Sequence, residues 1–234
     1  MTSINNKGKL NELALFAGAG GGLLASKVLG WRTVCAVELD HYCRSILIRR
    51  QNERFLDSFP IWDDVRTFDG KPWVSSIDIV TGGFPCQAFS NAAAGKNNAD
   101  DLWPEMFRIV ANVSPKFVFA ENVSKYAIDK ACDDLETVGY KTKAISLSAS
   151  DMGADHVRER HWLFAYSDDK SELLCKLNAE MAVCQKLQNR VWQTFSGNPR
   201  MDDGVANRME RFKATGNGQV PIVAATAWRL LNAP

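Results

Sequence analysis

The sequence lacks the paired cysteines of zinc sites. Its six cysteines are scattered at positions 35, 43, 86, 132, 175 and 184, and no two of them form a CxxC pair. Zinc sites use such pairs, and disulfide frameworks belong mainly to small secreted domains. We therefore expect reduced thiols and no metal site.

Long hydrophobic runs are also absent. The apolar stretches are far shorter than the roughly 20 residues of a membrane span. The opening residues MTSINNKGKLNE are polar and lack the apolar core of a secretory signal. With 234 residues and 46% hydrophobic content, the chain can bury one substantial core. We expect a cytoplasmic protein without a membrane partner, built as one domain or as one domain with an appendage.

The chain has almost no net charge. A formal charge of +1 argues neither for nor against a polyanionic partner, because a nucleic-acid enzyme can keep its basic residues local. Basic clusters are present at 49–54, 158–160 and 208–213. For the first of these, a solvated helix face is the safer interpretation.

The first two thirds of the chain alternate strand-like apolar runs with helical stretches. Strands are predicted at 12–18, 33–39, 61–65, 76–82, 116–121, 142–149 and 161–166, and helices at 21–30, 41–53, 103–113 and 124–139. This alternation is typical of βαβ units on a mostly parallel sheet. After about residue 167 it stops, and the pattern predicts a long amphipathic helix over 171–195, a loop over 196–204 and a closing helix over 220–231.

A glycine-rich turn, FAGAGGG (16–22), lies between the first predicted strand and helix. Glycines in this position let a ligand approach the backbone closely. Glu38 ends the second strand, where doubly wound folds place an acid that holds ribose hydroxyls, and Asp64 near the third strand can accept a hydrogen bond from an adenine amino group. These features suit a ligand with an adenosine half.

The turn does not suit a phosphate-bearing cofactor. Position 23 is leucine, so the dinucleotide spacing GxGxxG is not met, and no Lys or Arg lies in the turn. S-adenosylmethionine, which has a sulfonium and no phosphates, fits better than NAD or ATP.

Cys86 follows a proline in GGFPCQAFS (82–90), where a strand ends and a rigid turn begins. A cysteine that only packs is usually inside the strand, where its small apolar surface is used. We therefore expect the Cys86 thiol to face a cleft.

In order, these segments resemble the cytosine-C5 DNA methyltransferase family. The matching motifs are LFAGAGGG (15–22), ELD (38–40), DDV (63–65), GGFPCQAFS (82–90), DLWPE (101–105), ENV (121–123), RER (158–160) and GNGQVP (216–221). The resemblance implies a Rossmann-like class I S-adenosylmethionine-dependent methyltransferase fold, mostly parallel, with helices on both faces. It also implies a catalytic domain at 9–166 plus 214–234 and a short variable recognition segment at 167–213.

The family's cofactor shell transfers to residues in six of these eight motifs, all except ENV and RER. They are Phe16, Ala17, Gly18, Gly20, Gly21, Glu38, Leu39, Asp64, Val65, Gly83, Pro85, Leu102, Asn217 and Gly218. Of these, Phe16, Leu39 and Val65 would sandwich the adenine. Gly218 stands where the family often has a small hydroxyl residue or alanine, so we expect one weakened contact there.

The chemistry of the family explains the cysteine. Carbon 5 of cytosine is a poor nucleophile, and addition of a thiolate to carbon 6 makes it enamine-like, so that it can attack a sulfonium methyl group. A free thiol has a pKa of about 8.5, so its surroundings must help to form the thiolate. Cys86 would be this nucleophile, with Pro85 fixing the turn.

The other motif residues would support the cytosine. Glu121 would protonate or hydrogen-bond N3, and Arg160 would hold O2. Arg158 would brace the site by pairing with a carboxylate, and Asn122 would orient the loop that carries Cys86. The carbon-5 proton would leave through water.

The partner implied by the resemblance is duplex DNA from which the target base flips out. The DNA-binding candidates are Gln87, Ser90, Lys96, Arg200 and Arg208. Residues 90–100 would form a loop closing over the base, although a solvated loop explains Lys96 equally well. Phosphate contacts from the arginines would position the enzyme without specifying sequence.

The short variable segment leaves several interpretations open. One is a compact phage- or prophage-type methyltransferase of a bacterial or phage-infected cell, with or without a matching restriction enzyme. Another is an enzyme in which a partner protein or a second copy completes recognition. An RNA cytosine methyltransferase is an alternative, but the CFT tripeptide of that branch is absent. A non-catalytic module that binds cofactor or DNA would not need the complete PCQ, ENV and RER motifs.

Overall fold

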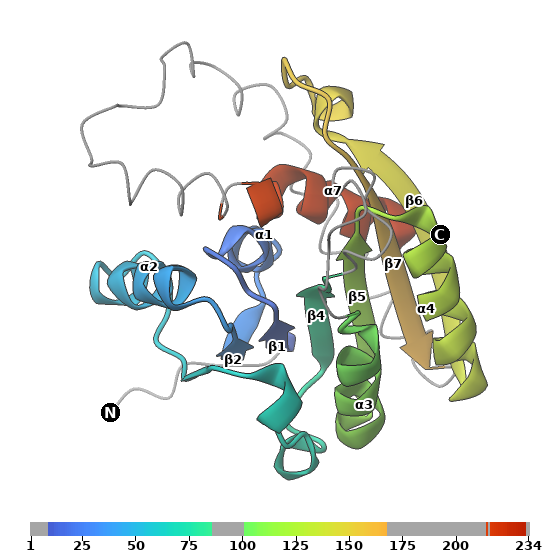
Figure 1. Ribbon diagram of the computed structural model, residues 1–234, viewed down its shortest axis with the longest axis horizontal. Coiled ribbons are helices and arrows are strands. Elements are labelled where there is room, and N and C mark those ends of the chain that lie inside the picture. Colours follow the sequence, from blue (N-terminus) through green and yellow to red (C-terminus); the bar gives the residue numbers. More distant parts are fainter. Residues whose placement is uncertain (1–8, 86–100, 168–213, 215, 233–234) are drawn as a thin grey trace.

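The computed structural model describes residues 9–85, 101–167, 214 and 216–232. These residues form one seven-stranded sheet of order β3-β2-β1-β4-β5-β7-β6 (Figure 1). The strands are β1 (Asn11–Leu15), β2 (Arg32–Val37), β3 (Ile61–Trp62), β4 (Ile79–Gly83), β5 (Phe117–Asn122), β6 (Tyr140–Ser148) and β7 (Glu159–Ser167). Strands β1 to β5 pair in parallel, and β7 runs antiparallel to both β5 and β6. The predicted mostly parallel α/β sheet is confirmed.

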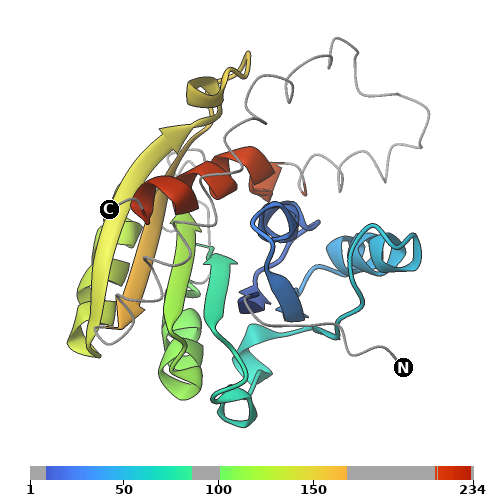
Figure 2. The same ribbon diagram turned by 180° about the vertical axis from the view of Figure 1, so that it is seen from behind.

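Helices cover both faces of the sheet, as expected. They are α1 (Gly21–Val28), α2 (His41–Asn52), α3 (Trp103–Val113), α4 (Lys125–Thr137) and α7 (Pro221–Leu231), with short 3-10 turns at Val65–Thr67, Lys71–Trp73 and Ala149–Met152. Helices α3 and α4 share one hydrophobic cluster with the sheet, whereas α1, α2 and α7 pack in clusters on its other face. Figures 1 and 2 show this division from the front and from behind.

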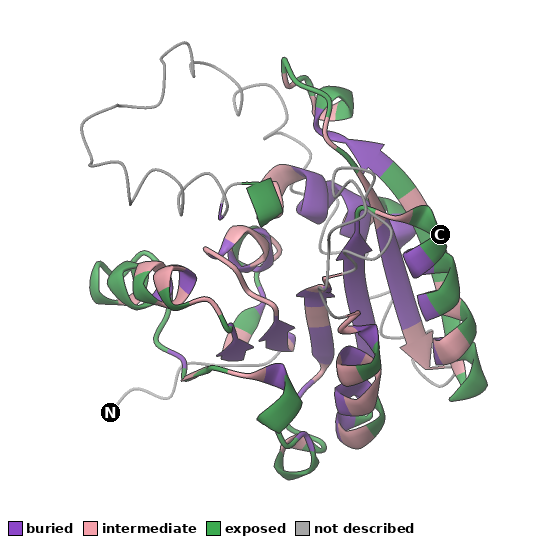
Figure 3. Cartoon of the chain, in the orientation of Figure 1, coloured by how far each residue is buried: buried purple, intermediate pink, exposed green. Residues whose placement is uncertain are grey.

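The central strands are buried on both sides, which explains their continuous apolar sequence. In β5, Val118 and Ala120 join the cluster of α3 and α4, while Phe117 and Phe119 join the cluster of α7. Figure 3 shows the same concentration of buried residues in the middle of the sheet. The carboxyl end of β5 is therefore a rigid place from which to present a side chain.

Trp228 anchors α7 across the sheet. Its ring meets those of Phe117, Phe119 and Phe164 edge to face at centroid distances of 6.0, 5.5 and 5.0 Å. On its other side, Trp31 meets it at 4.6 Å. Edge-to-face aromatic pairs add to the stabilisation that burial provides. These contacts hold the second half of α7 against β5 and β7.

The predicted elements are present, with shifted ends. The first strand ends at Leu15 rather than at residue 18, because Phe16 and Gly18 adopt positive φ angles of 53° and 55°. The third strand is reduced to Ile61–Trp62, since Asp64 caps a 3-10 turn. The predicted helix at 171–195 and loop at 196–204 lie outside the described residues. No described helix combines the length and apolar character needed to cross a membrane.

Candidate active site

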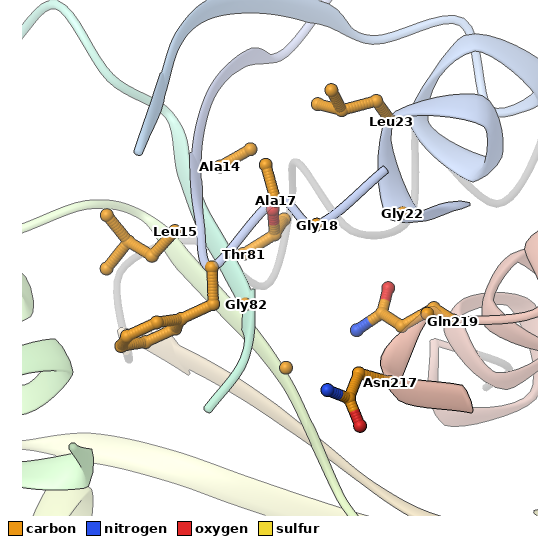
Figure 4. Close-up of a pocket in the computed structure, with 13 residues that line it drawn as sticks. Ala14, Leu15, Ala17, Gly18, Gly22, Leu23, Thr81, Gly82, Asn217 and Gln219 are labelled. Atoms are coloured by element: carbon orange, nitrogen blue, oxygen red, sulfur yellow. The ribbon is translucent and has the colours of Figure 1, made fainter. Parts of the chain in front are cut away.

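A pocket lies at the carboxyl ends of β1 and β4, beside the first turns of α1 and α7 (Figure 4). The empty space between its walls is about 400 Å³, a figure that includes open solvent. Its lining consists of Ala14–Gly18, Gly22, Leu23, Thr81–Gly83 and Asn217–Gln219. Doubly wound folds bind their ligands at this edge of the sheet. Of the predicted cofactor residues, the lining includes Phe16, Ala17, Gly18, Gly83, Asn217 and Gly218.

The glycine-rich turn opens α1 without a side-chain cap. Gly20 occupies the N-cap position with φ 95°, and no side chain hydrogen-bonds to the first turn of the helix. A Cβ on Gly20 would lie 3.0 Å from Leu47, and a Cβ on Gly21 would lie 2.2 Å from the carbonyl oxygen of Gln219. Gly20 and Gly21 therefore let α2 and the start of α7 approach the turn.

Glu38 ties the end of β2 to this turn. Its Oε2 accepts a hydrogen bond from the Gly18 amide at 2.6 Å, and its Oε1 accepts one from the Asp40 amide at 2.8 Å. The residue is 9% exposed, and burial raises the pKa of its carboxyl group, while these amide hydrogen bonds act in the opposite direction. Glu38 thus contacts the pocket wall through Gly18.

The other predicted cofactor residues lie around the pocket without lining it. Leu39 is 55% exposed, whereas Val65 is buried in the core cluster. The Asp64 carboxylate accepts hydrogen bonds from the Arg66 amide and guanidinium at 3.0 and 3.4 Å.

A hydrogen bond joins the last two predicted cofactor residues, Leu102 and Pro85. The Leu102 amide donates to the Pro85 carbonyl oxygen at 3.2 Å. The start of α3 is therefore attached to the residue that precedes Cys86.

The predicted nucleophile and the DNA contacts lie outside the described residues. They are Cys86, Gln87, Ser90, Lys96, Arg200 and Arg208. The residues that precede Cys86, up to Pro85, are described, and Asn122 contacts them. The Asn122 amide donates to the Phe84 carbonyl oxygen at 2.9 Å, and its Oδ1 accepts from the Ser124 amide at 2.9 Å. Buried Asn122 therefore connects the end of β5 to Phe84, two residues before Cys86 in the sequence.

Glu121 lies next to Asn122 at the end of β5 and is 6% exposed. Its Oε1 forms an ion pair with Arg160 Nε at 3.0 Å, and its Oε2 lies 3.5 Å from Gln219 Nε2. Burial raises the pKa of the Glu121 carboxyl group, opposed first by Arg160, then by Gln219 and Arg158. The arrangement brings the predicted Glu121 and Arg160 together.

Arg158 contacts the loop that precedes α7. Its Nη2 donates to the carbonyl oxygens of Gly216 and Gly218, both at 2.6 Å, and the nearby Glu121 carboxylate interacts with its charge. The ion pair with a carboxylate belongs to Arg160. Arg158 therefore fastens the 216–219 loop, because a guanidinium can donate to two carbonyls at once.

Sequence reasoning missed two residues beside the pocket. Gln219 lines it, and its position within GNGQVP was the available signal. Glu12 is 1% exposed and accepts hydrogen bonds from Ser26, Thr33 and Thr81 hydroxyls at 2.6, 2.7 and 2.8 Å. A charged residue in an otherwise apolar strand was the only hint of Glu12.

The types of side chain at the site limit the ligands that it can bind. Within residues 9–85, 101–167, 214 and 216–232, His, Cys, Asp and Glu side chains form no group of three or more that could hold a metal ion. Among the residues that the structure describes, no Lys or Arg lines the pocket. The described lining therefore offers a ligand backbone groups and the polar side chains of Thr81, Asn217 and Gln219.

The sheet order and the pocket at its carboxyl edge place the chain among proteins with a Rossmann-like methyltransferase fold. The chain belongs to the C-5 cytosine-specific DNA methylase family, whose sequence model matches residues 10–220. It is 33% identical over 169 residues to Type II methyltransferase M1.HphI of Haemophilus parahaemolyticus, covering 64% of this chain and 44% of that protein. It is 32% identical over 170 residues to M.HhaI of the same organism, covering 68% and 50%. The chain spans about half the length of the curated relatives that it matches.

Solved structures show the same fold. An Escherichia coli prophage-encoded chain, described as a DNA modification methyltransferase, superposes with a TM-score of 0.53 at 26% identity, covering 69% of this chain and 47% of that one. Schizosaccharomyces pombe Dnmt2 methyltransferase gives a TM-score of 0.53 at 21% identity, covering 70% and 55%. Because the second protein is only 21% identical to this chain, its similarity supports the fold assignment and nothing further.

Proposed function

We propose that this protein is a DNA (cytosine-5-)-methyltransferase that acts on a cytosine flipped out of duplex DNA. The observation that carries the proposal is Glu121, which is buried beside Arg160 at the border of the pocket and precedes Asn122, the residue that hydrogen-bonds to Phe84. A buried carboxyl group paired with a guanidinium suits hydrogen bonding to a ring nitrogen on which charge develops.

S-adenosylmethionine fits the pocket as the methyl donor. The glycine turn leaves the backbone open, the lining carries no cation that phosphates would require, and Glu38 lies beside Gly18, where it can reach ribose hydroxyls. Gly18, Gly83 and Asn217 would hold the ligand. When bound, it supplies a methyl group activated by a positively charged sulfur.

The chain's own residues would carry the reaction on the base. The Cys86 thiolate adds to carbon 6, which places negative charge on N3. Glu121 neutralises this charge by donating its proton or a hydrogen bond to N3. Carbon 5 then accepts the methyl group and loses its proton to water. The thiolate departs from carbon 6 as the C5–C6 double bond re-forms, and N3 returns any proton that it took to Glu121, which restores the ring and the acid. Burial raises the pKa of Glu121 and thus favours its protonated form at higher pH.

The remaining assignments complete the proposal. Residues 9–166 with 214–234 form the catalytic domain, and 167–213 form a short recognition segment. The protein would act in the cytoplasm of a bacterial or phage-infected cell. Arg160 would hold O2 of the cytosine, while Arg158 fastens the loop that contributes Asn217.

The test is transfer of a labelled methyl group to duplex DNA and to RNA. We expect label on DNA, loss of transfer in a Cys86→Ala variant, and covalent trapping of the wild type by duplex containing 5-fluorocytosine. Cys132→Ala on α4 is the matched control, because Cys132 is a free cysteine away from the pocket. Undiminished transfer by Cys86→Ala would refute the mechanism, and label on RNA alone would favour the RNA alternative.

Bisulfite sequencing of the DNA product reads the target context. A defined context would support recognition by the chain itself. Methylation without a context would point to a partner protein or a second copy that supplies specificity.

A further inference from the structure

The backbone of Gln219 is held independently of its side chain. Arg158 fixes the loop before it through the carbonyl oxygens of Gly216 and Gly218. On the other side, the first residue of α1 packs directly on Gln219, since a Cβ on Gly21 would lie 2.2 Å from the Gln219 carbonyl oxygen. A substitution at position 219 therefore changes the side chain without releasing the loop.

The side chain of Gln219 lies between two glycines from opposite walls of the pocket. A Cβ on Gly22 of α1 would lie 2.7 Å from its Oε1, and a Cβ on Gly83 of β4 would lie 3.1 Å from its Nε2. Figure 4 shows the amide pointing into the pocket. Glycine at these two positions leaves the space that the amide occupies.

The amide reaches Glu121. Gln219 Nε2 lies 3.5 Å from Glu121 Oε2, a long hydrogen bond, whereas Arg160 holds Oε1 at 3.0 Å. A Cβ on Gly83 would also lie 2.8 Å from Glu121 Oε2, so both side chains share the space next to this glycine. The carboxyl group is thus approached by a cation on one oxygen and by a neutral donor on the other.

We infer that Gln219 is a positioning residue, which holds Glu121 Oε2 at the border between the cofactor pocket and the base site. The inference rests on the proposed function, because it concerns the contact of Glu121 with N3 of the cytosine. Without the amide, Glu121 keeps Arg160 as its partner on one oxygen and loses the donor that limits its rotation. Since Gln219 also lines the pocket, a filled pocket confines the amide against Glu121.

The test is steady-state methyl transfer by Gln219→Leu, which removes the amide at similar size. We expect kcat to fall about tenfold, the usual scale for a lost hydrogen bond to a charged group, with a smaller change in the cofactor KM. The Gln219 N–H lowers the pKa of Glu121, so its loss raises that pKa and moves the alkaline limb of the kcat profile to higher pH. Gln219→Glu adds a second carboxylate and moves the limb further.

Gln51→Leu is the matched control, because it removes another amide, on α2, whose Oε1 accepts from the Phe59 amide at 3.3 Å. It should leave the limb in place. Should Gln219→Leu fail to fold, Gln219→Asn retains the amide but is one methylene shorter, and the same result is expected.

An unchanged kcat together with an unmoved limb in a folded position-219 variant overturns the inference if the wild type methylates DNA. A wild type that binds cofactor and methylates no DNA instead refutes the proposed function.

Discussion

Three buried carboxyl groups lie near the pocket, and each accepts hydrogen bonds or ion pairs from different partners. Glu38 receives backbone amides, Glu121 receives a guanidinium and an amide, and Glu12 receives only hydroxyls. Burial is the largest influence on all three, and it raises each pKa. In the described part of the chain, hydroxyl groups and no cation offset the burial of Glu12, so its charged form is the least compensated of the three.

Replacing Glu12 with glutamine tests this difference through the pH dependence of stability. Because the folded-state pKa is raised above the unfolded value, the folded protein keeps a proton that the unfolded chain has lost. Wild-type stability therefore falls as pH rises from the unfolded pKa to the folded one, by up to about 1.4 kcal/mol per pH unit. The Glu12→Gln variant lacks this contribution, so its free energy of unfolding relative to wild type should increase with pH.

Urea unfolding at acidic and mildly alkaline pH measures the effect. Glu53→Gln is the control, since Glu53 forms an exposed ion pair with Arg50, and such pairs contribute little. A Glu12→Gln difference that is independent of pH would contradict the assignment.

Residues of the site were predictable where they belong to ordered motifs, as with Glu121, Asn122 and Glu38. The network of Glu12 was not, because its hydroxyl partners come from α1, β2 and β4, at positions 26, 33 and 81. The two carbonyl partners of Arg158 were not predictable, for a related reason. Charge suggests a carboxylate, whereas the fold presents two carbonyl oxygens.

At the level of elements, alternation of apolar runs predicted the sheet and its helices. Their ends depend on local backbone geometry that periodicity does not contain, such as the positive φ of Phe16 and the cap at Asp64. The contact of α1 with the start of α7 joins segments about 200 residues apart in sequence, and no local pattern predicts it.

The substitution Gly21→Ala tests the contact between α1 and α7. In a free helix, alanine would be more stabilising than glycine by about 1 kcal/mol. Here its Cβ would lie 2.2 Å from a backbone oxygen of Gln219, so the elements must separate. We expect a net loss of about 1–3 kcal/mol, which lowers the melting temperature by several degrees.

Gly216→Ala is the control, because its Cβ would have no atom within 4 Å. Melting curves of the two variants should differ accordingly. Equal melting temperatures, or a more stable Gly21→Ala protein, would show that the helices do not meet as closely as described.

At the scale of the whole molecule, the pocket joins the first strand to the last helix. A ligand bound there interacts with residues that are distant in sequence, so it should stabilise the fold globally. At a concentration of 100 Kd, S-adenosylhomocysteine should add about 2.7 kcal/mol, which raises the melting temperature by roughly 5–10 °C for a chain of this size. Thermal melts with ATP and NAD serve as controls, and an equal shift with either would argue against a cofactor without phosphates.

The composition of the pocket wall also has a consequence for synthesis on the ribosome. Ala14–Gly18 leave the exit tunnel early, whereas Asn217–Gln219 emerge only after all seven described strands have been translated. A nascent chain therefore displays the glycine turn long before the opposite wall exists. A ligand that needs both walls stabilises only the completed fold. The earlier stages of folding must therefore depend on the burial of apolar residues.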